Sequence, residues 1–211
     1  MRIGIIGAGN VGSTLARHFV KAGDEVALAS AHGPESLGDL VAALGGHVRA
    51  VTPAEAADFG EVVVVAVPFG RYRELPADQL AGKTVIDTCN YYPQRDGQIA
   101  ELDEDRATSS ELLQRHLPGA HVVKAFNAMS SDHLRDYGHS SGAAMRYGIP
   151  VAGDHSAAKR QVFDLIEQIG FEPVDAGGLA DGGRKHQPGA DVYGADLPAE
   201  QLRERIGVGA S

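Results

Sequence analysis

Glycine residues at the spacing G-x-G-x-x-G occur near the start of the chain, at Gly7, Gly9 and Gly12. A short apolar segment, residues 1–6, precedes them, and a helical pattern of apolar residues follows to residue 22. In this setting the first glycine makes a tight turn, the second leaves room for a pyrophosphate against bare backbone, and the third lets the helix pack closely on the strand. The first N–H groups of the helix would face the pyrophosphate. The motif therefore predicts a dinucleotide site, with a ligand-free glycine turn as the alternative; its residues are Gly7, Ala8, Gly9, Asn10, Val11 and Gly12.

The residues that follow the second apolar segment, 25–30, bear on which dinucleotide binds. An NAD site usually carries Asp or Glu about 20 residues after the glycines, where the carboxylate bonds the ribose 2′-hydroxyl. Here Ser30, Ala31 and His32 occupy that region, and none of them is acidic. A serine hydroxyl can donate a hydrogen bond to a 2′-phosphate, and a histidine can donate one or carry a positive charge beside it. The sequence therefore favours NADP, although an arginine is absent here; the alternative for His32 is an exposed loop residue.

The composition argues against several classes of partner. The chain has 211 residues, a net charge of −9, nine histidines and one cysteine. The negative charge argues against nucleic acid and anionic membranes as partners, and no apolar run approaches the roughly 18–20 residues that span a bilayer. The single Cys89 and a start that is predicted to be a strand rather than a signal peptide predict a cytoplasmic protein. The histidines are scattered without zinc-ligand spacing, so no metal site is expected.

A sheet must position the glycine motif, and the pattern of the chain predicts one. Residues 62–67 form an unbroken apolar run, which is typical of a parallel strand buried on both faces. Strand and helix patterns alternate, which indicates βαβ units and an α/β fold with a Rossmann-type, doubly wound parallel sheet. Strands are expected at 2–6, 25–30, 47–51, 62–67, 83–87, 121–126, 149–153 and 171–175, and helices at 10–22, 34–44, 53–59, 75–80, 109–117 and 156–169, with a short marginal helix after residue 198. Loops are expected at 90–108 and from 178 to that last helix.

Helix caps and domain limits follow from the same pattern. Ser109 or Ser110 is expected to cap the helix that runs to residue 117, and Asp154 or Ser156 the helix that follows it in the second half. Residues 127–147 show no clear pattern apart from one possible helical turn at 131–137. We expect residues 1–147 to form the dinucleotide-binding domain and residues 148–211 a small C-terminal α/β lobe packed on it, either as separate units or as one compact unit.

Two residues at the end of one predicted strand lie where ligands bind in such sheets. Cys89 could touch the nicotinamide end of a cofactor, and the alternative is a packed thiol without a redox role. Asp87 precedes it, and strand-end aspartates commonly cap the following turn. Tyr91 and Tyr92 come next, and one of these rings could cover a cofactor or simply pack in the loop.

Several short segments occur together in one order along the chain. They are the glycine motif, Ser30–Leu37, Ala66–Pro68, Lys124–Asn127, Ile149–Asp154 and Pro173–Gly177. In this combination the chain resembles the family of NADP reductases that depend on coenzyme F420, a deazaflavin. Its dinucleotide-binding part is also similar to that of the transmembrane metalloreductases. The resemblance extends from residue 1 to about residue 195.

The resemblance implies hydride transfer between the nicotinamide and a deazaflavin stacked on it in a cleft. Such a transfer needs orientation and the exclusion of water rather than a protein acid or base, so no catalytic residue is expected. By the same resemblance Ser30 and His32 hold the 2′-phosphate, and the loop from Gly177 to His186 borders the second cofactor. The positions implied for the ribose and the two rings are Ala66, Val67, Pro68, Asn127 and Met129.

The chain departs from the family at two places. Many relatives carry Ser-Arg where this chain has Ala31 and His32, which bears on strict NADP preference. Arg184, Lys185 and His186 form a cationic cluster that could meet the negatively charged tail of the deazaflavin, or could be a solvated loop.

Three functions remain open from the sequence. The first is the NADP–F420 oxidoreductase, and the second is an NAD(P)H-dependent reductase of a flavin, quinone or other small acceptor. The third is a protein that binds NADP as a sensor without turnover. The segments that would separate the first two, 127–147 and 178–195, are those with the weakest pattern. A homodimer is expected, because so little chain roofs the site.

Overall fold

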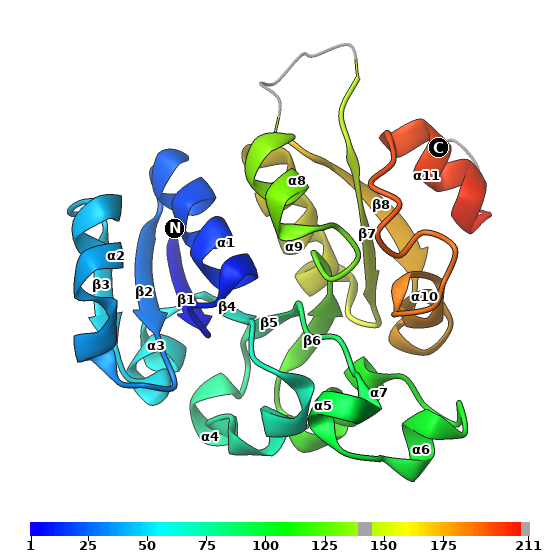
Figure 1. The fold of residues 1–211 in the computed structure, drawn as a ribbon, viewed down its shortest axis with the longest axis horizontal. Coiled ribbons are helices and arrows are strands. Elements are labelled where there is room, and N and C mark those ends of the chain that lie inside the picture. Colours follow the sequence, from blue (N-terminus) through cyan, green and yellow to red (C-terminus); the bar gives the residue numbers. More distant parts are fainter. Residues whose placement is uncertain (139–144, 208–211) are drawn as a thin grey trace.

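One sheet organises the molecule (Figure 1). The computed structural model describes residues 1–138 and 145–207, and within them eight strands follow the order β3-β2-β1-β4-β5-β6-β7-β8. Neighbouring strands are parallel, except that β6 and β7 are antiparallel. The strands are β1 Arg2–Ile6, β2 Glu25–Ala29, β3 Val48–Val51, β4 Val62–Val65, β5 Thr84–Asp87, β6 His121–Lys124, β7 Gly148–Gly153 and β8 Glu172–Gly177.

Apolar side chains cover both faces of this sheet, as expected for a doubly wound fold. Successive side chains of a strand point to opposite faces. In β4, Val62 and Val64 accordingly join the cluster that contains α1, α2, α8 and α9, whereas Val63 and Val65 join the cluster that contains α3, α4 and α7. All four valines are fully buried. The predicted α/β class and doubly wound, mostly parallel sheet are confirmed.

The helices occupy most of the intervening chain. Within the described residues, no helix is both long enough and apolar enough to cross a membrane. The helices are α1 Asn10–Lys21, α2 Gly38–Leu44, α3 Pro53–Phe59, α4 Ala77–Leu80, α5 Pro93–Asp96, α6 Ala100–Asp103, α7 Ser109–His116, α8 Ser131–Asp136, α9 Ser156–Gln168, α10 Leu179–His186 and α11 Ala199–Ile206, with 3-10 helices at Pro34–Leu37 and Phe69–Glu74.

Two helix starts differ from the prediction by one residue. Thr108 caps α7 in place of Ser109 or Ser110, because its side chain accepts a hydrogen bond from the N–H of Glu111 while the Glu111 carboxylate accepts one from the N–H of Thr108. This reciprocal pair is a capping box. His155 caps α9 in place of Asp154 or Ser156, with Nδ1 accepting from the N–H of Ala158 at 3.2 Å. The serines are thereby left inside the first turns.

Two expected loops contain helices. Residues 90–108 carry α5 and α6, and residues 179–186 form α10. The sequence pattern did not indicate α10, because Gly182 and Gly183 lower the helix propensity of this segment. A Cβ atom on Gly182 would lie 2.9 Å from both the Cβ of Ala152 and the carbonyl oxygen of Ala176, so the glycines let α10 lie directly on β7 and β8.

The C-terminal part extends the same sheet. β7 pairs with β6, and the side chains of β7, β8 and α11 form a third apolar cluster. α8 packs against α1, and β7 returns antiparallel to β6. Part of the unpatterned stretch, residues 139–144, lies outside the described residues. The division at residue 147 stays a prediction.

Candidate functional site

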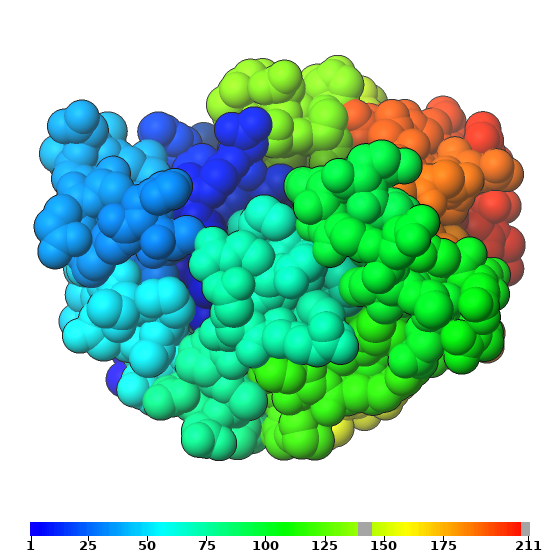
Figure 2. Space-filling view, turned by 60° about the horizontal axis from the view of Figure 1, so that its bottom comes forward, coloured from blue at the N-terminus to red at the C-terminus, as the bar shows by residue number. Residues whose placement is uncertain are grey.

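The predicted site residues lie at the carboxyl ends of five adjacent strands. The glycine motif follows β1, residues 30–32 follow β2, residues 66–68 follow β4, Cys89 follows β5, and residues 127–129 follow β6. Figure 2 shows the molecule with its lower side turned forward, and the dark blue start of the chain is visible there between the segment near residue 40 and the segment that follows β4. The edge where the predicted residues gather is the edge at which doubly wound sheets bind ligands.

The glycine motif has the geometry that the sequence predicts. Gly7 has a φ of +114°, a conformation that favours glycine, and its N–H donates to the carbonyl oxygen of Ala29 at 2.9 Å. A Cβ on Gly12 would lie 1.9 Å from the carbonyl oxygen of Gly7, whereas a Cβ on Gly9 would meet nothing within 4 Å. Gly7 and Gly12 are therefore required by packing, and the space at Gly9 is open to a ligand.

The start of α1 suits an anion. Gly9 caps the helix without a side chain, and the first turn contains no acidic residue. The first N–H groups of a helix lack partners within the helix and carry partial positive charge. A dinucleotide pyrophosphate fits this cradle, because the N–H groups would bind its oxygens and the bare Cα of Gly9 leaves room for them.

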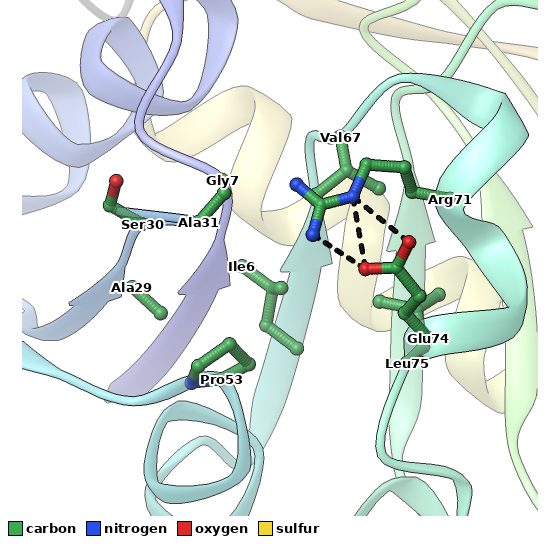
Figure 3. Close-up of a pocket in the computed structure, with 10 residues that line it drawn as sticks. All are labelled: Ile6, Gly7, Ala29, Ser30, Ala31, Pro53, Val67, Arg71, Glu74 and Leu75. Atoms are coloured by element: carbon green, nitrogen blue, oxygen red, sulfur yellow. Dashed lines mark hydrogen bonds and ion pairs between the residues drawn. The ribbon is translucent and has the colours of Figure 1, made fainter. Parts of the chain in front are cut away.

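A pocket beside the motif opens between β1, β2 and the segment after β4 (Figure 3). The backbone N–H of His32 donates to Oγ of Ser30 at 3.1 Å, and the side chain of His32 is exposed. Sequence reasoning missed Arg71, whose guanidinium binds Glu74 in the same pocket. Only its position shortly after the Val67-Pro68 segment could have drawn attention to it. The lining residues are Ile6, Gly7, Ala29, Ser30, Ala31, Pro53, Val67, Arg71, Glu74 and Leu75.

A buried amide connects three distant segments at the other end of the edge. Asn127 is 4% exposed, and its Nδ2 donates to the carbonyl oxygen of His186 at 2.7 Å and to Oδ1 of Asn90 at 3.1 Å. Nδ1 of His186 donates to Oδ1 of Asn127 at 2.8 Å. Burial, together with the nearby charges of Lys124 and Lys185, lowers the pKa of His186 to about 3. The imidazole is therefore neutral near pH 7, and the Asn127 amide is fixed by three hydrogen bonds.

The backbone is strained directly before this amide. Phe126 has a φ of +62° and is fully buried. A bulky side chain rarely adopts this conformation, which costs about 1–3 kcal/mol and occurs most often at functional sites. The turn at Phe126 lets the chain leave β6 with Asn127 facing Asn90, so the strain orients the amide network.

An ion pair lies beneath the same end of the edge. Lys124 and Asp87 are fully buried, and Lys124 Nζ lies 3.5 Å from Asp87 Oδ2. Nζ also donates to the carbonyl oxygen of Cys89 at 2.9 Å. Asp87 accepts hydrogen bonds from the N–H of Cys89 at 2.9 Å and from Oγ of Ser110 at 2.6 Å, which confirms its expected role in capping the turn. The pair fixes the turn that follows β5.

Two of the predicted cofactor contacts are buried. Cys89 is 4% exposed, and its thiol donates to the carbonyl oxygen of Val65 at 3.6 Å. Burial and the charge of Asp87 raise its pKa well above the usual value, so the thiol is protonated and packed. Met129 is 7% exposed and belongs to the apolar cluster beside α1. Contacts of either residue with a cofactor stay predictions.

The expected cationic cluster near the C-terminus is absent from the described structure. His186 is buried and neutral, as described above. Arg184 is paired with Asp105 at 3.2 Å and lies 3.9 Å from Glu111. Two of the three side chains are therefore paired or buried, the segment is a helix rather than a loop, and a contact with the tail of a deazaflavin stays a prediction.

A second pocket, of about 280 Å³, lies beside the residues that follow β5. Tyr91 donates to Asp103 at 2.8 Å, and the hydroxyl of Tyr92 bonds that of Tyr193, so both rings are fixed by hydrogen bonds. No group of three or more His, Cys, Asp or Glu residues that could hold a metal ion occurs in residues 1–138 and 145–207. The pocket is lined by Tyr91, Tyr92, Pro93, Leu102, Asp103, Ala107, Ser109, Gln187 and Pro188.

The sheet order, the glycine turn and the start of α1, where Gly9 provides no side-chain cap, define a Rossmann-type dinucleotide-binding fold. The family described as NADP oxidoreductase, coenzyme F420-dependent, matches residues 2–91. A hypothetical protein of Sinorhizobium meliloti, SMa0349, is 32% identical with a TM-score of 0.79, over 93% of this chain and 94% of that one. A candidate F420-dependent NADP reductase of Arthrobacter sp. FB24 is 27% identical with a TM-score of 0.72, over 85% of this chain and 86% of that one. The match to this F420-dependent NADP oxidoreductase family thus covers residues 2–91, which contain the glycine motif and strands β1 to β5.

A longer relative is similar to this chain over part of its length. Metalloreductase STEAP3 of Rattus norvegicus is 32% identical over 184 residues, which are 85% of this chain and 34% of that protein. The chain thus spans about a third of the length of the curated relatives it matches.

Proposed function

We propose that the protein transfers hydride between NADP(H) and the deazaflavin coenzyme F420 at the carboxyl edge of the sheet. The observation that carries the proposal is the open glycine turn at Gly9 on the same sheet edge as a hydrogen-bonded polar network at the ends of β5 and β6, in a chain whose residues 2–91 match this family. The first feature suits the pyrophosphate of a dinucleotide. The second provides fixed walls against which two flat rings can stack.

The residues of the chain act by binding and orientation. The N–H groups at the start of α1 bind the pyrophosphate, and Ser30 and His32 hold the 2′-phosphate. Val67 and Pro68 line the ribose and nicotinamide beside Ala66. When bound, the nicotinamide supplies the hydride chemistry, and the protein holds the reacting atoms in line and excludes water.

The acceptor is proposed to enter from the side of Tyr91 and Tyr92. The pocket there is bounded by the end of α10 through Gln187 and Pro188. Fixed tyrosine rings suit a flat aromatic ring, because offset stacking and edge contacts add to area burial. Asn127 follows β6, the neighbour of β5, and its amide binds Asn90 just before Tyr91, so it lies at the side of this pocket where it can contact a bound ring.

A second candidate is an NAD(P)H-dependent reductase of a flavin or another small acceptor. It is supported by the 32% identity to a protein named as a metalloreductase, whose name indicates a different final acceptor. The same edge would bind the dinucleotide in either case, so the two candidates differ in the acceptor pocket. A cytoplasmic location and a homodimer remain part of the proposal.

A paired acceptor assay tests the proposal. Purified protein is mixed with NADPH or NADH and with oxidised F420, FMN or a quinone, and the nicotinamide and deazaflavin absorbance bands are followed. NADPH-dependent bleaching of F420 alone is the expected result. Turnover of FMN or quinone without F420 would move the function to the second candidate, and nucleotide binding without turnover of any acceptor would indicate a sensor.

A further inference from the structure

The pocket beside the glycine turn contains one cation that no sequence motif indicates. Arg71 lies in the 3-10 helix Phe69–Glu74, and its side chain is 46% exposed. Figure 3 shows its guanidinium extending from the segment after β4 toward the opposite wall, where Gly7, Ser30 and Ala31 lie. Among the residues that line the pocket, Arg71 alone is basic.

Glu74 holds this guanidinium from one side. Nε donates to Glu74 Oε1 and Oε2 at 3.1 and 3.0 Å, and Nη2 donates to Oε2 at 2.5 Å. These bonds fix the plane of the group, and the structure gives Nη1 no hydrogen bond within the described residues. Arg71 therefore presents free N–H donors to the pocket from a restrained position.

The opposite wall is the position that distinguishes NADP from NAD. In Rossmann folds the residues at the end of β2 face the ribose 2′ position, and here those residues are Ser30 and Ala31. A 2′-phosphate at this position would enter the pocket that Arg71 lines from the other side. Guanidinium groups bind phosphate with paired hydrogen bonds, and such charge-assisted bonds are stronger than neutral ones.

We propose that Arg71, restrained by Glu74, binds the 2′-phosphate of NADP across the pocket from Ser30. This inference rests on the proposed NADP site and names the residue that gives that site its specificity. The arginine that the turn after β2 lacks is thus supplied by the segment after β4. NAD, which has a hydroxyl in place of the phosphate, gains little from this contact.

Binding measurements on Arg71→Gln test the proposal, with Arg73→Gln as the matched control. Arg73 is exposed two residues away and lies over the ring of Tyr72 at 4.9 Å, outside the pocket. The dissociation constants of NADPH and NADH are measured by calorimetry, and 2′,5′-ADP is compared with 5′-AMP. Thermal unfolding shows whether each variant is folded, which is expected because both side chains are exposed.

Arg71→Gln should weaken NADPH and 2′,5′-ADP by about 10–100-fold and change NADH and 5′-AMP less than about twofold. Arg71→Lys should give an intermediate loss of NADPH affinity, since a lysine keeps the positive charge but lacks the paired N–H donors of the guanidinium. Equal losses for NADPH and NADH would overturn the proposal and assign Arg71 to the shared adenosine. Unchanged NADPH affinity in Arg71→Gln would also overturn the proposal, but it would leave the proposed nucleotide site intact. A wild-type protein that binds neither nucleotide would instead contradict the proposed function.

Discussion

At the β1–β2 end of the carboxyl edge the candidate site residues are largely exposed, whereas at the β5–β6 end they are buried and bonded to one another. His32 and Arg71 reach into solvent or an open pocket. Asn127, Lys124 and Asp87 are at most 4% exposed and are held by distant partners. Under the proposed function the β1–β2 end holds the adenosine, so a few surface side chains there would set the nucleotide preference. The β5–β6 end, proposed to face the two rings, depends instead on an intact interior.

Removing the buried cation Lys124 should have the largest effect on stability, because Lys124 is paired with Asp87 in the interior at the β5–β6 end. Lys124→Met leaves Asp87 charged and without its cation, and breaking one partner of a buried pair costs about 3–5 kcal/mol. The midpoint of thermal unfolding should fall by on the order of 10 °C. Calorimetry against Lys21→Met, a change at an exposed position, provides the comparison. A loss no larger than that of the control would mean that the pair does not stabilise this end.

Substitutions at Gly9 and Gly12 should have different effects, one on nucleotide binding and the other on folding. Gly9→Val adds a side chain in open space at a φ of −70° that any residue can adopt, so the protein should fold normally. The new side chain occupies the space of the pyrophosphate, and NADPH affinity should fall by more than about 100-fold. Gly12→Val should instead destabilise the fold, since its Cβ would meet the carbonyl oxygen of Gly7. Unchanged NADPH affinity in folded Gly9→Val would remove the site assignment.

The buried imidazole should make stability depend on pH. The folded pKa of His186 is about 3, below the unfolded value of 6.5, so the unfolded chain takes up a proton first as pH falls. The stability from this residue is therefore present above pH 6.5 and declines below it, by about 2 kcal/mol between pH 7 and pH 5. Urea unfolding at both pH values should show a smaller decline for His186→Gln than for wild type. An identical fall in the free energy of unfolding for both proteins would show that His186 is not the source of the pH dependence.

The smallest effect is expected at the exposed turn after β2. His32→Arg should tighten NADPH by about 3–10-fold, because a permanent charge is placed near the 2′-phosphate, and should leave NADH within about twofold. Fluorescence titration of both nucleotides measures the change. An equal gain for both nucleotides would show that residue 32 does not face the 2′-phosphate.

The sequence predicted what is encoded locally and missed what is assembled from distant segments. The glycine turn, the strand ends and most strands follow from short spacings and apolar runs. The bonds of Asn127 to Asn90 and His186 join residues far apart in the chain, so no local pattern could indicate them. Arg71 was missed for the same reason, and α10 was missed because its glycines serve packing against β7 and β8 rather than a turn.

Direct transfer of hydrogen between the two rings is the central claim, and isotope labelling tests it most directly. NADPH carrying deuterium on one face of nicotinamide C4 is mixed with the protein and oxidised F420 in ordinary water, and the reduced deazaflavin is analysed by mass spectrometry and NMR. The account predicts deuterium at C5 of the deazaflavin from one face of NADPH only. Reduced deazaflavin that carries hydrogen from water, or F420 that stays oxidised beside bound NADPH, would contradict it.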